Sequence, residues 1–171
     1  MLDLSPENGY DNHIFPSGLL MEERKMNQLD IARDLAYVYN DGQMYGENDY
    51  SFHLFDVADM VWDWVVDTWT QERIDTVMAI AWNHDLIEDT DCTYAKMMDA
   101  GLSLEVIVAV EALTKVKGES YEDYISRVRA NALALFVKKA DTLCNLTQSL
   151  KEGNVYRIMK YTKQLQLLTE E

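Results

Sequence analysis

Apolar residues recur at helical spacing through most of this chain, and this pattern constrains its fold more than any other feature. Between residues 27 and 40, for example, Leu29, Ala32, Leu35 and Tyr39 are three or four positions apart, so they share one face of a helix. No segment shows the sustained alternation of apolar and polar residues that is typical of a half-buried strand. The sequence therefore predicts an all-α fold, a bundle of about seven or eight helices. The segments with helical spacing are 27–40, 51–66, 74–87, 103–115, 120–130, 131–150 and 154–168.

The length of 171 residues suits one compact domain, and 48% hydrophobic residues can fill its core. Both prolines precede residue 20, so we interpret residues 1–26 as an irregular leader and residues 27–171 as the domain. The N-terminus lacks the basic start and apolar block of a secretory signal, and no apolar run approaches the roughly 18 residues of a membrane span. A cytoplasmic protein is predicted, with Cys92 and Cys144 as free thiols.

The net charge of −15 argues against nucleic acid as the main partner, because a phosphate backbone is bound by clustered Lys and Arg. The charge is also unevenly distributed. Residues 41–100 contain 14 acidic and 2 basic residues, whereas residues 113–171 contain 10 basic and 7 acidic residues. A polyanionic substrate of this protein would therefore need a bound cation, together with basic groups from the second half, to offset the negative field of the first.

Two histidines and two aspartates have a spacing that allows separate helices to converge on one metal ion. They are His53, the adjacent pair His84 and Asp85, and the distant Asp141. Imidazole and carboxylate ligands suit a divalent transition metal, which would also compensate the cost of burying these groups. Mn²⁺ is favoured over Zn²⁺, because half of the ligands are carboxylate oxygens and none is a thiolate. Glu88 and Asp89 follow His84 and Asp85 by four residues each, so on a continuous helix each shares a face with a ligand.

Short motifs surround each of the proposed ligands. They are Gly42-Gln43 and Gly46 with Tyr50-Ser51-Phe52-His53, then Trp82-Asn83-His84-Asp85 with Glu88-Asp89-Thr90, and Val137-Lys138-Lys139-Ala140-Asp141 with Asn145. In this order they resemble the HD-domain phosphohydrolases, and more narrowly the hydrolase domain of the RelA/SpoT group and its small stand-alone relatives. The resemblance covers roughly residues 27–150 and implies the helical bundle of an HD domain, in agreement with the periodicity.

The resemblance also implies an enzyme that hydrolyses a phosphate ester or anhydride of a nucleotide with a divalent metal. Such a metal lowers the pKa of a water and polarises the phosphoryl group, while a nearby carboxylate orients the water or accepts its proton. Glu88 and Asp89 are the candidates for that carboxylate, with solvation of a helix end or a salt bridge as the alternative. Asn145 is implied as a ribose or phosphate contact, Lys138 fits a phosphate-binding role or a solvated basic edge, and Tyr45 could stack on a base. Further basic candidates, each expected more often on the surface, are Lys115, Lys117, Arg127 and Arg129.

The loop before His53 departs from the family pattern. In the ppGpp hydrolases an Arg or Lys usually follows the Gly-Gln pair and contacts the nucleotide, but here Met44 and Tyr45 hold those positions. The resemblance still makes guanosine 3',5'-bis(diphosphate), or ppGpp, the best single substrate, with loss of its 3'-pyrophosphate. A dNTP, a nucleoside monophosphate and NADPH are alternative substrates, and a non-catalytic module that binds a nucleotide or a partner protein is an alternative of a different class. The sequence leaves open the oligomeric state, the physiological metal and the preferred base.

Overall fold

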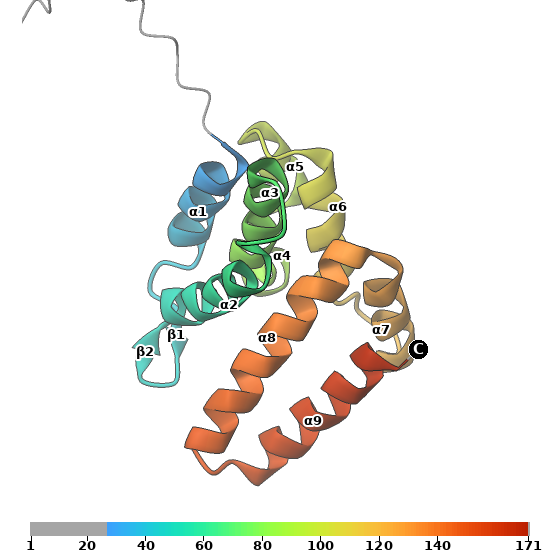
Figure 1. Cartoon of the computed structure of the whole chain (residues 1–171). Coiled ribbons are helices and arrows are strands. Elements are labelled where there is room, and N and C mark those ends of the chain that lie inside the picture. The colour runs from blue at the N-terminus through green and yellow to red at the C-terminus, as the bar shows by residue number, and fades with distance from the viewer. Residues whose placement is uncertain (1–26, 171) are drawn as a thin grey trace, which may run out of the picture.

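The computed structural model describes residues 27–170, so the predicted leader, residues 1–26, lies outside the described part. The described chain is a bundle of helices with one two-stranded antiparallel hairpin, and the predicted all-α fold is confirmed (Figure 1). Seven of its helices have ten or more residues, and only α4 and α5 are shorter. The elements are α1 Gln28–Tyr39, β1 Met44–Tyr45, β2 Asn48–Asp49, α2 Tyr50–Val65, α3 Gln71–Trp82, α4 Leu86–Asp89, α5 Tyr94–Asp99, α6 Leu104–Leu113, α7 Tyr121–Ala130, α8 Ala132–Lys151 and α9 Val155–Thr169.

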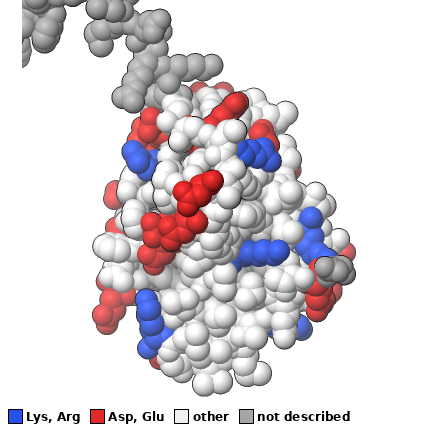
Figure 2. All heavy atoms as spheres, viewed as in Figure 1, with Lys and Arg blue, Asp and Glu red and all other residues white. Residues whose placement is uncertain are grey.

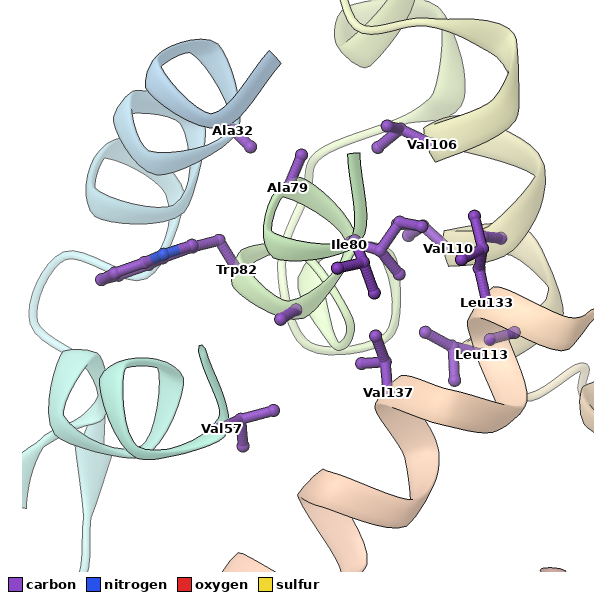
Figure 3. Close-up of a cluster of buried hydrophobic side chains, with 14 of the residues drawn as sticks. Ala32, Val57, Ala79, Ile80, Trp82, Val106, Val110, Leu113, Leu133 and Val137 are labelled. Atoms are coloured by element: carbon purple, nitrogen blue, oxygen red, sulfur yellow. The ribbon is translucent and has the colours of Figure 1, made fainter. Parts of the chain in front are cut away.

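Helix α3 occupies the centre of the bundle and packs against α1, α2, α6 and α8. Its side chains from Thr76 to Trp82 are all buried, because neighbouring helices cover it on several sides. Figure 3 shows its Ile80 among apolar side chains of α6 and α8, which include Val110, Leu113 and Val137. Full burial of one such side chain stabilises the fold by roughly 1.5–3 kcal/mol. This packing holds the C-terminal end of α3 against α8. These two segments position most of the residues of the site described below.

The predicted C-terminal end of the third helix is wrong. A single helix was expected over residues 74–87, but α3 ends at Trp82, residues 83–85 form a turn, and α4 begins at Leu86. The Asn83 side chain donates to the carbonyl oxygens of Ala79 and Ala32, at 3.0 and 3.1 Å. Because the first of these oxygens would accept the next main-chain hydrogen bond of the helix, the side chain ends α3 and ties it to α1. Consequently His84 and Glu88 do not share one continuous helix.

The predicted start of the second helix is also wrong in detail. Helix α2 begins at Tyr50, and its N-cap residue is Asp49, whose carboxylate accepts a hydrogen bond from the Ser51 N–H at 2.9 Å. Ser51, the first residue of the predicted segment 51–66, lies inside the helix. Thr70 occupies the N-cap position of α3, but its side chain makes no capping hydrogen bond. The predicted end of the first helix is confirmed, since Gly42 takes a positive φ of 76° just after α1.

Charge is unevenly distributed on the face of the molecule that Figure 2 shows. Figure 2 shows Asp and Glu gathered in a patch on one side of the visible face, while Lys and Arg are dispersed. Cys92 and Cys144 are free thiols, as predicted. No helix within residues 27–170 is long and apolar enough to cross a membrane.

Candidate metal and active site

The four proposed metal ligands converge, although they come from three parts of the chain. His53 lies in the first turns of α2, His84 and Asp85 lie in the turn between α3 and α4, and Asp141 lies in the middle of α8. One ligand atom from each residue falls within 4.8 Å of the others. The Nε2 atom of His53 is 3.2 Å from Oδ1 of Asp141, and the Nε2 atom of His84 is 3.0 Å from Oδ2 of Asp85. This predicted convergence is confirmed.

The tautomer of His84 fits a metal ligand. Its Nδ1 atom is 2.8 Å from the carbonyl oxygen of Ala81, and because a carbonyl can only accept, Nδ1 must donate. In a neutral imidazole the Nε2 atom then carries a lone pair, which faces the carboxylates of Asp85 and Asp141 at 3.0 and 3.6 Å. Nε2 is buried and has no hydrogen-bond partner among the described residues. A lone pair directed at two carboxylates needs a cation or a proton between them, so this donor set fits a divalent metal.

The electrostatics of the cluster lead to the same conclusion. Burial alone would lower the pKa of His84, but Asp85 and Asp141 outweigh that effect and raise it to about 10. Burial alone would raise the pKa of Asp141, but Lys138 and the two imidazoles hold it well below its usual range. The same negative field that retains a proton on His84 would bind a cation in its place, and binding would release that proton.

Hydrogen bonds from neighbouring residues orient the two carboxylates. The Tyr50 hydroxyl donates to Oδ2 of Asp85 at 2.8 Å. The Asn145 amide donates to Oδ1 of Asp141 at 2.6 Å, and the Tyr45 hydroxyl donates to the Asn145 amide oxygen at 2.9 Å. The Tyr45 ring also stacks on the imidazole of His53, with ring centres 4.6 Å apart. Asn145 and Tyr45, predicted as substrate contacts, are therefore both engaged with ligand residues, while each still lines the cavity described next.

A cavity of about 200 Å³ opens on three of the four ligands. It brings together carboxylates, lysines and tyrosines from five helices and the hairpin. Lys138, for which a phosphate-binding role was one of two alternatives, lines it, and so does Lys115, which was expected more often on the surface; Lys117, Arg127 and Arg129 do not line it. The lining residues are Tyr45, Tyr50, His53, Asp85, Glu88, Asp89, Lys115, Tyr121, Lys138, Asp141, Asn145, Lys160, Tyr161 and Gln164.

Glu88 and Asp89 both line this cavity, but their surroundings differ. One carboxylate oxygen of Glu88 is 2.8 Å from the ammonium group of Lys115, and the other accepts from the Lys115 main-chain N–H at 3.2 Å. No hydrogen bond or ion pair reaches the Asp89 carboxylate from any residue between 27 and 170. Burial and the charges of Asp85 and Glu88 raise the pKa of Asp89. Its main-chain carbonyl accepts from Gln43 at 3.1 Å, which connects the Gly-Gln motif to this end of the site.

Helix α9 contributes residues that the sequence analysis missed. Lys160 and Tyr161 line the cavity, and the Arg157 guanidinium lies 6.0 Å from the ring centre of Tyr45. Lys160 and Tyr161 also form a cation–π pair at 4.9 Å. The only signal in the sequence was the spacing of these basic and aromatic residues over one turn of the last predicted helix. That spacing does not reveal which neighbour the helix packs against.

A second cavity, of about 270 Å³, lies beside the first and shares Tyr45 and His53 with it. Its remaining walls come from α2 and α8 and are mainly polar. They are formed by Asp56, Asp59, Met60, Asp63, Cys144, Thr147, Gln148 and Lys151. The stacked pair of Tyr45 and His53 thus borders both cavities. Together the two cavities give the candidate active site room for an extended ligand.

No family model matches the sequence, and no curated protein matches it significantly. Among solved structures, the chain is similar to a metazoan ortholog of SpoT that hydrolyses ppGpp and plays a role in starvation responses. The TM-score is 0.65 and the sequence identity is 21%, over 91% of this chain and 88% of that one. The fold that the motifs predicted is confirmed by this likeness: the chain shares the helical fold of a SpoT-type ppGpp hydrolase.

Proposed function

We propose that this protein is a cytoplasmic, metal-dependent nucleotide phosphohydrolase, with the 3'-pyrophosphate of ppGpp as the group it removes best. The observation that carries the proposal is one cavity that joins a buried donor set of two imidazoles and two carboxylates to two further carboxylates and several lysines. The likeness to a ppGpp-hydrolysing protein supports the same substrate class. A binding module without turnover has no evident need for both sets of carboxylates.

The roles of the residues follow from their positions. His53, His84, Asp85 and Asp141 would hold a divalent cation, proposed to be Mn²⁺, which polarises a phosphoryl oxygen and lowers the pKa of a water. Asp89 has the carboxylate that no described residue engages, so it is suited to accept the proton of the attacking water. Glu88 holds Lys115 at the wall of the cavity, where the ammonium group can contact a phosphate.

Lysines and tyrosines around the cavity suit a nucleotide with several phosphates. Met44 and Tyr45 lack the positive charge expected in the loop before His53. Lys160 of α9 lines the cavity and would supply such a charge, and the Arg157 guanidinium lies over the Tyr45 ring. Asn145 and Tyr45 would contact the ribose or base beside the metal ligands. The adjoining cavity, with Gln148 among its polar walls, offers space for the nucleoside. Local cations would thereby offset the negative field of the first half of the chain.

Release of phosphate or pyrophosphate from a nucleotide panel with added Mn²⁺ tests this function. The panel contains ppGpp, dNTPs, nucleoside monophosphates and NADPH. We expect pyrophosphate from ppGpp at the highest kcat/KM and no turnover after chelation with EDTA. Turnover of another nucleotide alone would keep the enzyme class and replace the substrate. Nucleotide binding by calorimetry without turnover of any substrate would favour a non-catalytic binding module.

Substitution of Lys160 tests the contribution of α9. Lys160→Ala should raise KM for ppGpp by about tenfold, corresponding to roughly 1.4 kcal/mol from one charge-assisted contact, with kcat little changed. Lys163→Ala is the matched control, because Lys163 is an exposed lysine of the same helix that lines neither cavity. Steady-state kinetics on both variants at fixed ionic strength measure the difference. Equal KM values for the two variants would show that α9 does not contact the phosphates.

A further inference from the structure

Lys138 is a buried lysine inside the metal site. Its side chain is only 8% exposed, and its ammonium nitrogen lies 2.8 Å from Oδ2 of Asp141, three residues later on α8. A solvated basic edge, one of the two roles considered for this residue, does not agree with that burial. Burial of an ammonium group without a partner costs free energy, and the Asp141 carboxylate is that partner. The ion pair therefore largely determines where the ammonium group lies.

The two oxygens of Asp141 consequently have different surroundings. Oδ1 faces the Nε2 atoms of His53 and His84, at 3.2 and 3.6 Å, and accepts from the Asn145 amide. Oδ2 faces Lys138. The carboxylate therefore presents one oxygen to the space between the imidazoles and the other to a cation of the protein itself.

The ring of Tyr124 also packs near Lys138. Its ammonium nitrogen lies 5.9 Å from the ring centre of Tyr124, a side chain that is 2% exposed. The Tyr124 hydroxyl donates to the carbonyl oxygen of Leu113 at 2.9 Å, which fixes the ring at the end of α6. A lysine between a fixed aromatic face and a carboxylate has little freedom to turn toward a bound ligand.

We propose that Lys138 is a positioning residue that limits Asp141 to a single metal-ligating oxygen. A carboxylate can bind a cation through one oxygen or through both, and the second mode occupies one more coordination position. By engaging Oδ2, Lys138 keeps that position available for water or substrate. This inference rests on the metal site of the proposed function, but it assigns Lys138 to Asp141 and not to the substrate phosphate.

The hydration of bound Mn²⁺ tests the inference without any hydrolysis assay. Water-proton relaxation counts the exchangeable waters on Mn²⁺, and Lys138→Met replaces the lysine by an apolar side chain of similar length. Four protein ligand atoms leave about two open positions on a six-coordinate Mn²⁺, so two-oxygen binding by Asp141 should lower the relaxivity per bound Mn²⁺ by about half. Lys138→Arg, which keeps a cationic donor, should retain the wild-type relaxivity. Lys139→Met, at the neighbouring lysine, is the matched control and should also behave like the wild type.

Each outcome of this measurement has one meaning. Unchanged relaxivity in Lys138→Met, at unchanged Mn²⁺ occupancy, would overturn the inference, and a raised KM for ppGpp in the same variant would return Lys138 to phosphate binding. If Lys138→Met does not fold, Lys138→Ala takes its place, because alanine has no N–H group on its side chain to donate to Asp141. Failure of the wild-type protein to bind Mn²⁺ would instead contradict the proposed function, and the two failures are therefore distinguishable.

Discussion

Asp85→Asn should weaken Mn²⁺ binding by about 10²-fold or more and, at limiting Mn²⁺, remove nearly all hydrolysis. The substitution keeps the shape of the side chain, and its amide oxygen can still accept the hydrogen bond that Tyr50 donates to Asp85 at 2.8 Å. It removes one of the two negative charges in the donor set, next to the His84 Nε2 atom at 3.0 Å. Calorimetric titration with Mn²⁺, followed by hydrolysis assays at limiting and saturating Mn²⁺, measures both effects.

Asp67→Asn is the matched control for this loss of charge. Asp67 is an exposed aspartate just after α2 that belongs to the same acidic half of the chain, but it lines neither cavity and is not in the donor set. Similar losses of Mn²⁺ affinity in the two variants would show that the general field, and not ligation by Asp85, holds the ion. Thermal unfolding separates either result from misfolding, because Mn²⁺ at 100 times its Kd stabilises a protein that binds it by about 2.7 kcal/mol.

The four candidate metal ligands could be selected from the sequence because their chemistry is rare in it. Two of the three histidines lie beside or near aspartates in predicted helices, and a shared cation would compensate the cost of burying all four groups. The same reasoning gave the all-α fold, since helical spacing recurs in seven segments. The fold prediction depends on a short-range pattern, and the ligand prediction depends on the order of three short motifs, both of which the sequence displays directly.

The turn that presents His84 could not be predicted in this way. Local spacing favours one helix through residues 74–87, and nothing nearby in the sequence opposes it. The helix ends where it does because Asn83 also bonds to the carbonyl of Ala32, which is 51 residues earlier on α1. A tertiary contact thus overrides local propensity, and the change of direction aims His84 and Asp85 at α2 and α8.

The contributions of α9 depend on tertiary structure in the same way. Gly153, with a positive φ of 66°, turns the chain between α8 and α9, and only the packing of these two helices brings Lys160 and Tyr161 to the cavity. The partner of Lys138, by contrast, could have been found from the sequence. Lys138 and Asp141 are three residues apart on one predicted helix, a spacing at which side chains meet.

Glu88 and Asp89 have different surroundings in the structure and are therefore expected to have different roles. The sequence alone does not distinguish between them. Glu88 is engaged at both oxygens by Lys115, whereas Asp89 lines the cavity with its carboxylate free of described partners. A group that accepts a proton during catalysis needs an available oxygen and a pKa closer to neutrality than that of a surface aspartate. Burial, Asp85 and Glu88 shift the pKa of Asp89 in that direction. Glu88 is better placed to position the ammonium group that meets the substrate.

Asp89→Asn should therefore lower kcat by about 10²-fold or more while leaving Mn²⁺ affinity within a factor of about three, because an amide cannot accept the proton. Glu88→Gln should chiefly raise KM, since it loosens Lys115 and leaves the proton acceptor intact. Asp91→Asn, two residues beyond Asp89 with its side chain 87% exposed, controls for the charge change at this end of α4. Kinetics and Mn²⁺ titration of the three variants decide between the roles. A kcat loss in Glu88→Gln as large as that in Asp89→Asn would make Glu88 the proton acceptor, and loss of Mn²⁺ from Asp89→Asn would make Asp89 a ligand.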